Sequence, residues 1–181
     1  MHKFEPWFCV PALIVPAMVS APAFAVQYLN LEQAQKALFP SADLFEPAAL
    51  NLNPAQRHAI ETASGVKVRI NEVKVWRAKQ GGKASGWLML DEVIGKHELI
   101  TYAVAISNDG VVQGVEILDY RESHGGAVRN PKWLAQFHGK KAGSPLQLDD
   151  DIKNLSGATL SCLHMVEGVR RLLSTYATAL K

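Results

Sequence analysis

Residues 155–161 read Leu-Ser-Gly-Ala-Thr-Leu-Ser and lead directly into a long stretch of helical, amphipathic periodicity. We expect this segment to open the last helix of the chain. The first backbone N–H groups of a helix have no intrahelical partner, and the helix dipole adds partial positive charge there. Gly157 lets a ligand approach the backbone, Ala158 keeps the next position small, and Thr159 presents a hydroxyl where a phosphate binds. The alternative is an ordinary helix start with Ser156 as the N-cap.

The last helix is expected to have one apolar and one polar side, because its apolar residues recur at helical spacing. The apolar stripe consists of Cys162, Val166, Val169, Leu173 and Tyr176, and the polar stripe of His164, Glu167, Arg171 and Ser174. Docking of the apolar stripe on a sheet would fix the start of the helix in space. Cys162 is therefore predicted to be a buried, inert thiol.

Upstream of this helix, alternating apolar and polar residues predict strands joined by hairpins. The clearest hairpin signal is Asn-Asp-Gly at 108–110. A short helix is expected from Asn130-Pro131 to Gly139, with Trp133 and Phe137 in the core. The expected strands cover 66–70, 73–75, 87–94, 101–107 and 111–118, with a flexible hairpin loop at 80–86 and a loop at 140–155. Antiparallel hairpins with separate flanking helices predict an α+β fold.

Residues 26–65 are interpreted as a helical N-terminal extension that packs on this domain. Asn30 and Gln33 form a capping-box pattern at the start of a helix that ends before Pro40. A second helix is predicted to begin at Asn53, which is followed by proline in the first turn, and to stop at Gly65.

The first 25 residues resemble an export signal. Lys3 precedes a largely apolar stretch at 7–20, and Ala-Phe-Ala at 23–25 fits the small-x-small cleavage rule. Cleavage would leave an extracytoplasmic, periplasmic protein that begins at Val26. The alternative is a retained membrane anchor, but the stretch is rich in proline and shorter than the about 20 apolar residues that a spanning helix needs.

Composition excludes several classes of protein. The formal net charge is +2, and no basic patch interleaved with aromatic residues supports nucleic-acid binding. Removal of the leader would also remove Cys9 and leave one thiol, so no intramolecular disulfide is expected. No His or Cys spacing indicates a metal site. No Gly-x-Gly-x-x-Gly indicates a dinucleotide-binding fold.

Four motifs, in order, resemble the FMN-binding domain family over roughly residues 66–175. They are Gly-Val-Glu-Ile-Leu at 114–118, Glu-Ser-His-Gly-Gly at 122–126, Pro-Lys-Trp-Leu-Ala-Gln-Phe-His-Gly-Lys at 131–140, and Ser-Gly-Ala-Thr at 156–159. This family includes the covalent-flavin subunits of the sodium-pumping NADH:quinone reductase and of the Rnf complex. We assign the domain to 66–181. The sequence departs from the family pattern at His124, where the family has proline, and at Lys153, where the attachment signal has an acidic residue. Asp151 lies two residues further back.

The resemblance implies that Thr159 carries FMN through a phosphoester bond. It also implies a flavin transferase that delivers FMN from FAD, and a redox partner or membrane electron-transport complex. The other expected cofactor-binding residues are Ser156, Gly157, Ala158, Leu160 and Ser161 around the attachment point, Glu122, Ser123, His124, Gly125 and Gly126 in the glycine turn, and Lys96.

Several alternatives stay open. The polar run at 91–98 is interpreted as a solvated loop, or as a segment in which Lys96 or His97 lines the flavin pocket. An electron-transfer flavoprotein is favoured over a stand-alone enzyme. The other functional classes are a flavin-dependent reductase of a small acceptor and a partner-binding module without flavin.

Overall fold

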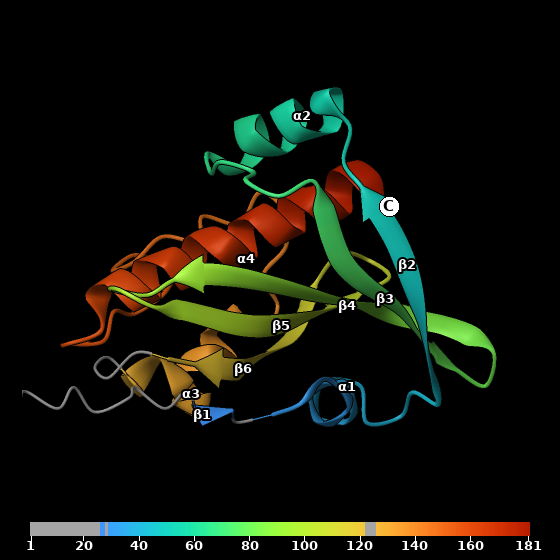
Figure 1. Cartoon of the computed structure of the whole chain (residues 1–181), viewed down its shortest axis with the longest axis horizontal. Helices are drawn as coiled ribbons and strands as arrows, with labels where there is room; N and C mark the ends of the chain where they lie inside the picture. The colour runs from blue at the N-terminus through green and yellow to red at the C-terminus, as the bar shows by residue number, and fades with distance from the viewer. Residues whose placement is uncertain (1–25, 28, 122–125) are drawn as a thin grey trace, which may run out of the picture.

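The computed structural model describes residues 26–27, 29–121 and 126–181. Its centre is a six-stranded antiparallel sheet in the order β1-β6-β5-β4-β3-β2, so that β2 to β6 form a meander (Figure 1). The strands are β1 (Val26–Gln27), β2 (Leu44–Asn51), β3 (Glu72–Gln80), β4 (Lys83–Ile94), β5 (Leu99–Ser107) and β6 (Val112–Tyr120). The helices are α1 (Leu31–Leu38), α2 (Pro54–Ser64), η1 (Gly126–Arg129), α3 (Pro131–Leu134), η2 (Ala135–Phe137) and α4 (Thr159–Ala179).

Two layers of helix cover the sheet. The long helix α4 crosses one face and α1 packs on the other, while α2 lies against the outer side of α4 (Figure 1). The main core lies between α4 and the sheet, and a smaller apolar cluster lies beneath α1. This arrangement confirms the α+β fold. Among the described residues, no helix is both long enough and apolar enough to cross a membrane.

Glycine turns set the strand connections near the centre of the sheet. Gly81 and Gly82 both have positive φ, +54° and +75°, and form a two-residue hairpin between β3 and β4. The loop expected at 80–86 is therefore much shorter, because the strands extend into it. The Asn-Asp-Gly hairpin at 108–110 is confirmed. Gly110 has a φ of +79°, and a Cβ there would meet the Tyr176 ring at 2.7 Å.

The two helix starts predicted in the N-terminal segment are confirmed. Asn30 accepts a hydrogen bond from the Gln33 N–H at 2.9 Å, and the Gln33 side chain accepts from the Asn30 N–H at 2.8 Å. Asn53 and Gln56 form the same reciprocal pair at the start of α2. Gly65 ends α2 in the left-handed conformation.

The interpretation of 26–65 as a helical extension is wrong in one respect, because this segment also supplies both edges of the sheet. β1 pairs with the end of β6, and β2 pairs with β3 along its whole length. Pro47 lies in β2, which tolerates a missing N–H because it is an edge strand. The strand expected at 66–70 is absent, since Val68 instead bonds α2 through Glu61 and Arg57.

The expected polar stripe of α4 is also partly wrong. All five residues of the apolar stripe are buried, but Ser174, which the periodicity places on the polar side, is buried as well. The reason is that α2 packs on the outer side of α4, so the second half of this helix is enclosed from two directions. Cys162 is fully buried, as predicted, and burial raises the pKa of its thiol.

Candidate functional site

A tight turn at residues 155–158 immediately precedes α4. The Ala158 N–H donates to the Leu155 carbonyl oxygen at 3.0 Å, and Gly157 within the turn has a φ of +80°. No atom lies within 4 Å of the place where a Cβ on Gly157 would be. The backbone conformation therefore requires glycine here, and the surface over the turn is open.

Thr159 is the first residue of α4, and its side chain is exposed. The N-cap is Ala158, which offers no side-chain cap, so the alternative of Ser156 as a capping residue is wrong. The first N–H groups of α4 thus lack a side-chain acceptor from the cap residue and face the position that a ligand on Thr159 would occupy. The Thr159 hydroxyl accepts a hydrogen bond of 3.3 Å from the Asn154 amide.

The other cofactor-binding residues expected around Thr159 differ in their exposure to solvent. Ser156, Gly157 and Leu160 are exposed, whereas Ala158 and Ser161 are buried. Ser161 follows Thr159 by two residues, which is more than half a helical turn, so its side chain points into the protein and only its backbone faces the helix end. Ser161 stays a predicted cofactor-binding residue, with its hydroxyl buried in this structure.

The remaining expected residues lie at the same end of the molecule or outside the described part of the chain. Lys96 is exposed in the turn between β4 and β5. Gly126 begins η1, which follows β6. Glu122, Ser123, His124 and Gly125 lie outside the described residues. Figure 1 shows the start of α4, the β4–β5 hairpin and the end of β6 at one end of the fold.

The β4–β5 hairpin is tied to α4 by a histidine that helical periodicity places only on the polar stripe. His164 Nδ1 lies 2.6 Å from the Ile94 carbonyl oxygen and 3.2 Å from that of Gly95. The Gly95 N–H donates to the Glu98 carbonyl oxygen at 2.7 Å and closes the turn. A separation of 70 residues between His164 and Ile94 leaves no local signal for this contact.

A partly buried polar cluster ties the second half of α4 to the sheet. Asp91 Oδ2 accepts hydrogen bonds from Tyr102 Oη at 2.8 Å and from Arg171 Nη2 at 2.5 Å. Burial and the neighbouring Asp91 carboxylate raise the pKa of Tyr102, so its hydroxyl keeps its proton. Burial opposes the charge on Arg171, but the neighbouring acidic groups, Asp91 foremost, together outweigh burial and raise the pKa of the guanidinium. Asp91 thus lies in a strand and not in the solvated loop expected at 91–98.

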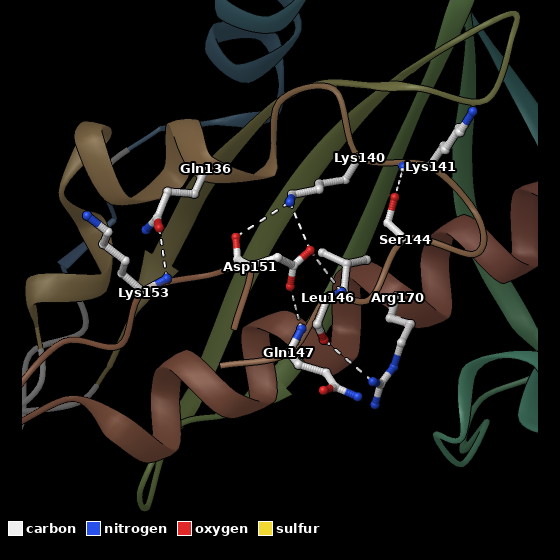
Figure 2. Close-up of polar contacts among 9 residues, drawn as sticks. All are labelled: Gln136, Lys140, Lys141, Ser144, Leu146, Gln147, Asp151, Lys153 and Arg170. Carbon is white, nitrogen blue, oxygen red and sulfur yellow. Dashed lines mark hydrogen bonds and ion pairs between the residues drawn. The ribbon is translucent and has the colours of Figure 1, made fainter. Parts of the chain in front are cut away.

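Asp151 organises the loop that precedes the site (Figure 2). Its carboxylate accepts from Lys140 Nζ at 2.8 Å, from the Gln147 N–H at 2.8 Å and from the Leu146 N–H at 3.1 Å. Burial raises the pKa of this carboxyl, but the three donors together outweigh burial and lower it. The Asp151 charge is therefore balanced within the loop by Lys140 and two backbone N–H groups.

Two contacts hold the chain between this loop and the turn. Trp133 Nε1 donates to the Lys153 carbonyl oxygen at 2.7 Å, and the Lys153 N–H donates to Gln136 Oε1 at 2.8 Å (Figure 2 shows the second). Trp133 and Phe137 are buried, with their rings edge to face at 5.3 Å, which confirms that they belong to the core. The Lys153 side chain is exposed.

A pocket of about 440 Å³ lies on the other side of the sheet, between the start of α1 and the ends of β5 and β6. Thr101, Asp119 and Arg121 contribute its polar groups, and Arg121 pairs with Asp119 at 2.8 Å. The sheet separates this pocket from α4. Within the described ranges, no three His, Cys, Asp or Glu side chains gather as metal ligands would.

The described residues thus bring together an exposed threonine, the N–H groups of a helix start without a side-chain cap, and an open glycine turn, which is the kind of surface that can hold a phosphate group. These groups fit the phosphate of a flavin mononucleotide. Residues 95–174 match the family model of the FMN-binding domain. The matched segment, residues 95–174, belongs to the FMN-binding domain family, as the motifs indicated.

Curated relatives and a solved structure agree with this assignment. The chain is 28% identical over 142 residues to the C subunit of the Na(+)-translocating NADH-quinone reductase of Pasteurella multocida, covering 67% of this chain and 55% of the relative. It is 31% identical over 110 residues to the corresponding protein of Vibrio vulnificus, covering 51% of this chain and 43% of the relative. The chain thus spans about half the length of the curated relatives it matches.

The fold is similar to that of the crystal structure of Shewanella oneidensis NqrC. The TM-score is 0.51 at 18% sequence identity, and the match covers 85% of this chain and 79% of that chain. At this identity, the likeness supports the fold.

Proposed function

We propose that this protein carries FMN on Thr159 through a phosphoester bond and transfers electrons outside the cytoplasm. The observation that supports attachment is the exposed Thr159 side chain at the first position of α4, next to a turn that only glycine adopts without strain. The flavin itself supplies the redox chemistry, and the protein supplies its position and electrostatic surroundings.

The start of α4 suits a phosphodiester, which carries one negative charge. The free N–H groups of the first turn and the helix dipole both stabilise an anion there, by typically 0.3–1 kcal/mol for the dipole at an exposed site. The Asn154 amide, which donates to the Thr159 hydroxyl at 3.3 Å, can keep donating to the ester oxygen. Because Lys140 pairs with Asp151, the acidic run at 149–151 opposes this anion less than its formal charge suggests.

Attachment requires a separate flavin transferase. In the proposed step, the Thr159 hydroxyl oxygen bonds to the phosphorus of the FMN half of FAD, the phosphoanhydride bond breaks, AMP leaves and the hydroxyl proton is released. A metal-assisted site for this step has no counterpart among the described residues, where no group of three acidic, histidine or cysteine side chains is assembled. The chain is therefore the substrate of this reaction.

Electron transfer and extracytoplasmic location are proposed on separate grounds. The curated relatives are subunits named for a Na(+)-translocating NADH-quinone reductase, which supports a role beside redox partner proteins. The apolar stretch at 7–20 and the Ala-Phe-Ala site at 23–25 support export and cleavage. Covalent attachment would prevent loss of the cofactor in a compartment where free flavin is not resupplied.

Mass spectrometry of the protein, coexpressed with a bacterial flavin transferase, tests the attachment. We expect one adduct of about 440 Da, the mass of FMN less water, on the peptide that contains Thr159. Thr159→Ala should abolish the adduct, while Thr62→Ala, which removes an exposed threonine hydroxyl on α2, should retain it. An adduct that persists in Thr159→Ala would contradict the assignment.

A second experiment tests the dependence on a transferase. Unmodified protein mixed with FAD and a divalent cation should stay unmodified, whereas addition of the transferase should produce the adduct. Modification without the transferase would contradict this part of the proposal.

A further inference from the structure

His164 makes a contact that the attachment chemistry does not explain. Its Nδ1 atom faces two carbonyl oxygens, those of Ile94 at 2.6 Å and Gly95 at 3.2 Å. Carbonyl oxygens only accept hydrogen bonds, so Nδ1 carries the hydrogen and donates. The ring is half-buried, and its bond joins α4 to a hairpin 70 residues away in the sequence.

The carbonyl groups that His164 contacts belong to the root of a short turn. Ile94 ends β4 and Leu99 begins β5, and the two residues are paired in the sheet. The Gly95 N–H closes the turn by donating to the Glu98 carbonyl oxygen. Holding the carbonyls of Ile94 and Gly95 therefore fixes the direction in which the whole turn at 95–98 leaves the sheet.

The apolar side chains nearest to the turn and on the outer face of the helix start are partly exposed. Ile94 is 52% exposed and Leu99 42%, while on α4 Leu160 is 46% exposed and Leu163 37%. Weakly packed segments depend more on individual hydrogen bonds for their order. The His164 contact is a polar link that holds the turn against the first two turns of α4.

We propose that His164 is a positioning residue that holds the 95–98 turn at the end of α4 that carries Thr159 and thereby fixes one wall of the flavin's surroundings. The inference rests on the proposed attachment of FMN to Thr159. His164 follows Thr159 by five residues, about 7.5 Å along the helix axis and about 140° around it, and the β4–β5 hairpin lies at the end of the fold where α4 begins (Figure 1), within the reach of a tethered flavin. The turn carries the exposed side chains of Lys96 and His97. His164 acts through this turn and not by contact with the reacting atoms.

Hydrogen exchange in the flavin-free protein, expressed without a transferase, tests the contact itself. In His164→Phe, which keeps a ring but removes the donor, we expect amide exchange in 95–98 to rise roughly five- to tenfold. His164→Asn, whose amide can donate to a carbonyl, should restore part of the protection. His58→Phe is the matched control, because His58 is exposed on α2 and its replacement should leave exchange in 95–98 unchanged.

Iodide quenching of flavin fluorescence in the FMN-loaded variants tests the positioning role. The Stern–Volmer constant should rise in His164→Phe, return toward the wild-type value in His164→Asn, and stay unchanged in His58→Phe. Faster exchange with unchanged quenching would overturn the positioning role. Unchanged exchange would overturn the contact as a determinant of the turn. Absence of the adduct from the wild-type protein would instead refute the attachment, and the exchange experiment would still decide whether His164 holds the turn.

Discussion

The second half of α4 is enclosed by the sheet and α2 and is held by partly buried polar groups. The first two turns, in contrast, expose Thr159, Leu160 and Leu163. Arg171 reaches Asp91, and Tyr176 Oη donates to the Asn108 carbonyl oxygen at 2.5 Å. At the other end, the Thr159 side chain has one described bond, at 3.3 Å. A helix fixed at one end can present a modifiable residue at the other without losing its direction.

The buried end should show the largest loss of stability. Asp91→Ala leaves the Arg171 charge and the Tyr102 hydroxyl without their partner, so we expect the free energy of unfolding to fall by about 2–3 kcal/mol. Urea denaturation measures the change. Glu92→Ala, an exposed position on the same strand, should shift it by no more than about 0.5 kcal/mol. Equal effects of the two substitutions would show that the cluster does not secure α4.

The loop that leads to α4 should show an intermediate effect with a defined pH dependence. Asp151→Asn weakens the Lys140 pair and the two backbone bonds, so we expect a loss of about 1–2 kcal/mol at neutral pH. The folded-state pKa of Asp151 lies below its ordinary value of 3.8. Its stabilisation is therefore fully present above that value and is lost as pH falls through the folded pKa.

Thermal unfolding as a function of pH measures this contribution. The wild type should lose stability more steeply than Asp151→Asn as the pH falls below the ordinary carboxyl pKa. Asp150→Asn, at a neighbouring exposed carboxylate, is the control and should follow the wild type. If the wild type and Asp151→Asn lost stability equally as the pH fell, the Asp151 carboxylate would not stabilise the loop.

The exposed end should show a loss of stability no larger than that at Asp151, together with a lower yield of the proposed FMN adduct. Gly157→Ala forces a side chain into a left-handed conformation, which costs about 1–2 kcal/mol, although no atom obstructs the new Cβ. We expect the yield of the FMN adduct to fall with it. Gly143→Ala, at a φ of +86° and also unobstructed, should cost similar stability and retain the adduct, measured by intact mass. Equal yields of the adduct in Gly157→Ala and Gly143→Ala would show that attachment does not depend on the conformation of the turn at Gly157.

The smallest expected effect concerns the charges around the flavin. Replacing Glu122 with Gln should raise the reduction potential, because a nearby carboxylate disfavours the anionic reduced flavin. Lys96→Met should lower it. Both shifts should be on the order of tens of millivolts, since one partly solvated charge contributes about 1 kcal/mol or less. Redox titration of the two variants measures the shifts. If each potential shifts in the direction opposite to the one predicted, neither side chain lies beside the isoalloxazine.

Local signals predicted the parts of the fold that depend on neighbours in sequence. The capping boxes at Asn30 and Asn53 and the Asn-Asp-Gly hairpin each act within a few residues, and each is confirmed. The edge strand β2 has no such signal, because Pro47 interrupts the pattern of a strand and is tolerated only at an edge position, which tertiary pairing sets. The alternation at 66–70 is misleading for the same reason, since Val68 bonds a helix and not a strand.

The candidate site divides in the same way. Thr159 and Gly157 stand in a compact motif, and a helix start can be read from consecutive residues. His164 and Asp91 meet partners 70 and 80 residues away, so their roles follow from the packing of α4 on the sheet. Asp151 is recognisable in the sequence as an acidic neighbour of the motif, but its pairing with Lys140 depends on the loop geometry.

The pairing of β1 with β6 bears on the order in which the chain folds. Strands β2 to β6 follow one another as a meander and can assemble from short hairpin closures, whereas Val26 must find Tyr120 across the whole sheet. Closing a longer loop costs more entropy and slows the step that needs it. On the proposed export route, the first residues after the cleavage site would therefore dock late, once β6 has formed. We expect the peptidase to act on a chain whose first residues have not yet joined the sheet.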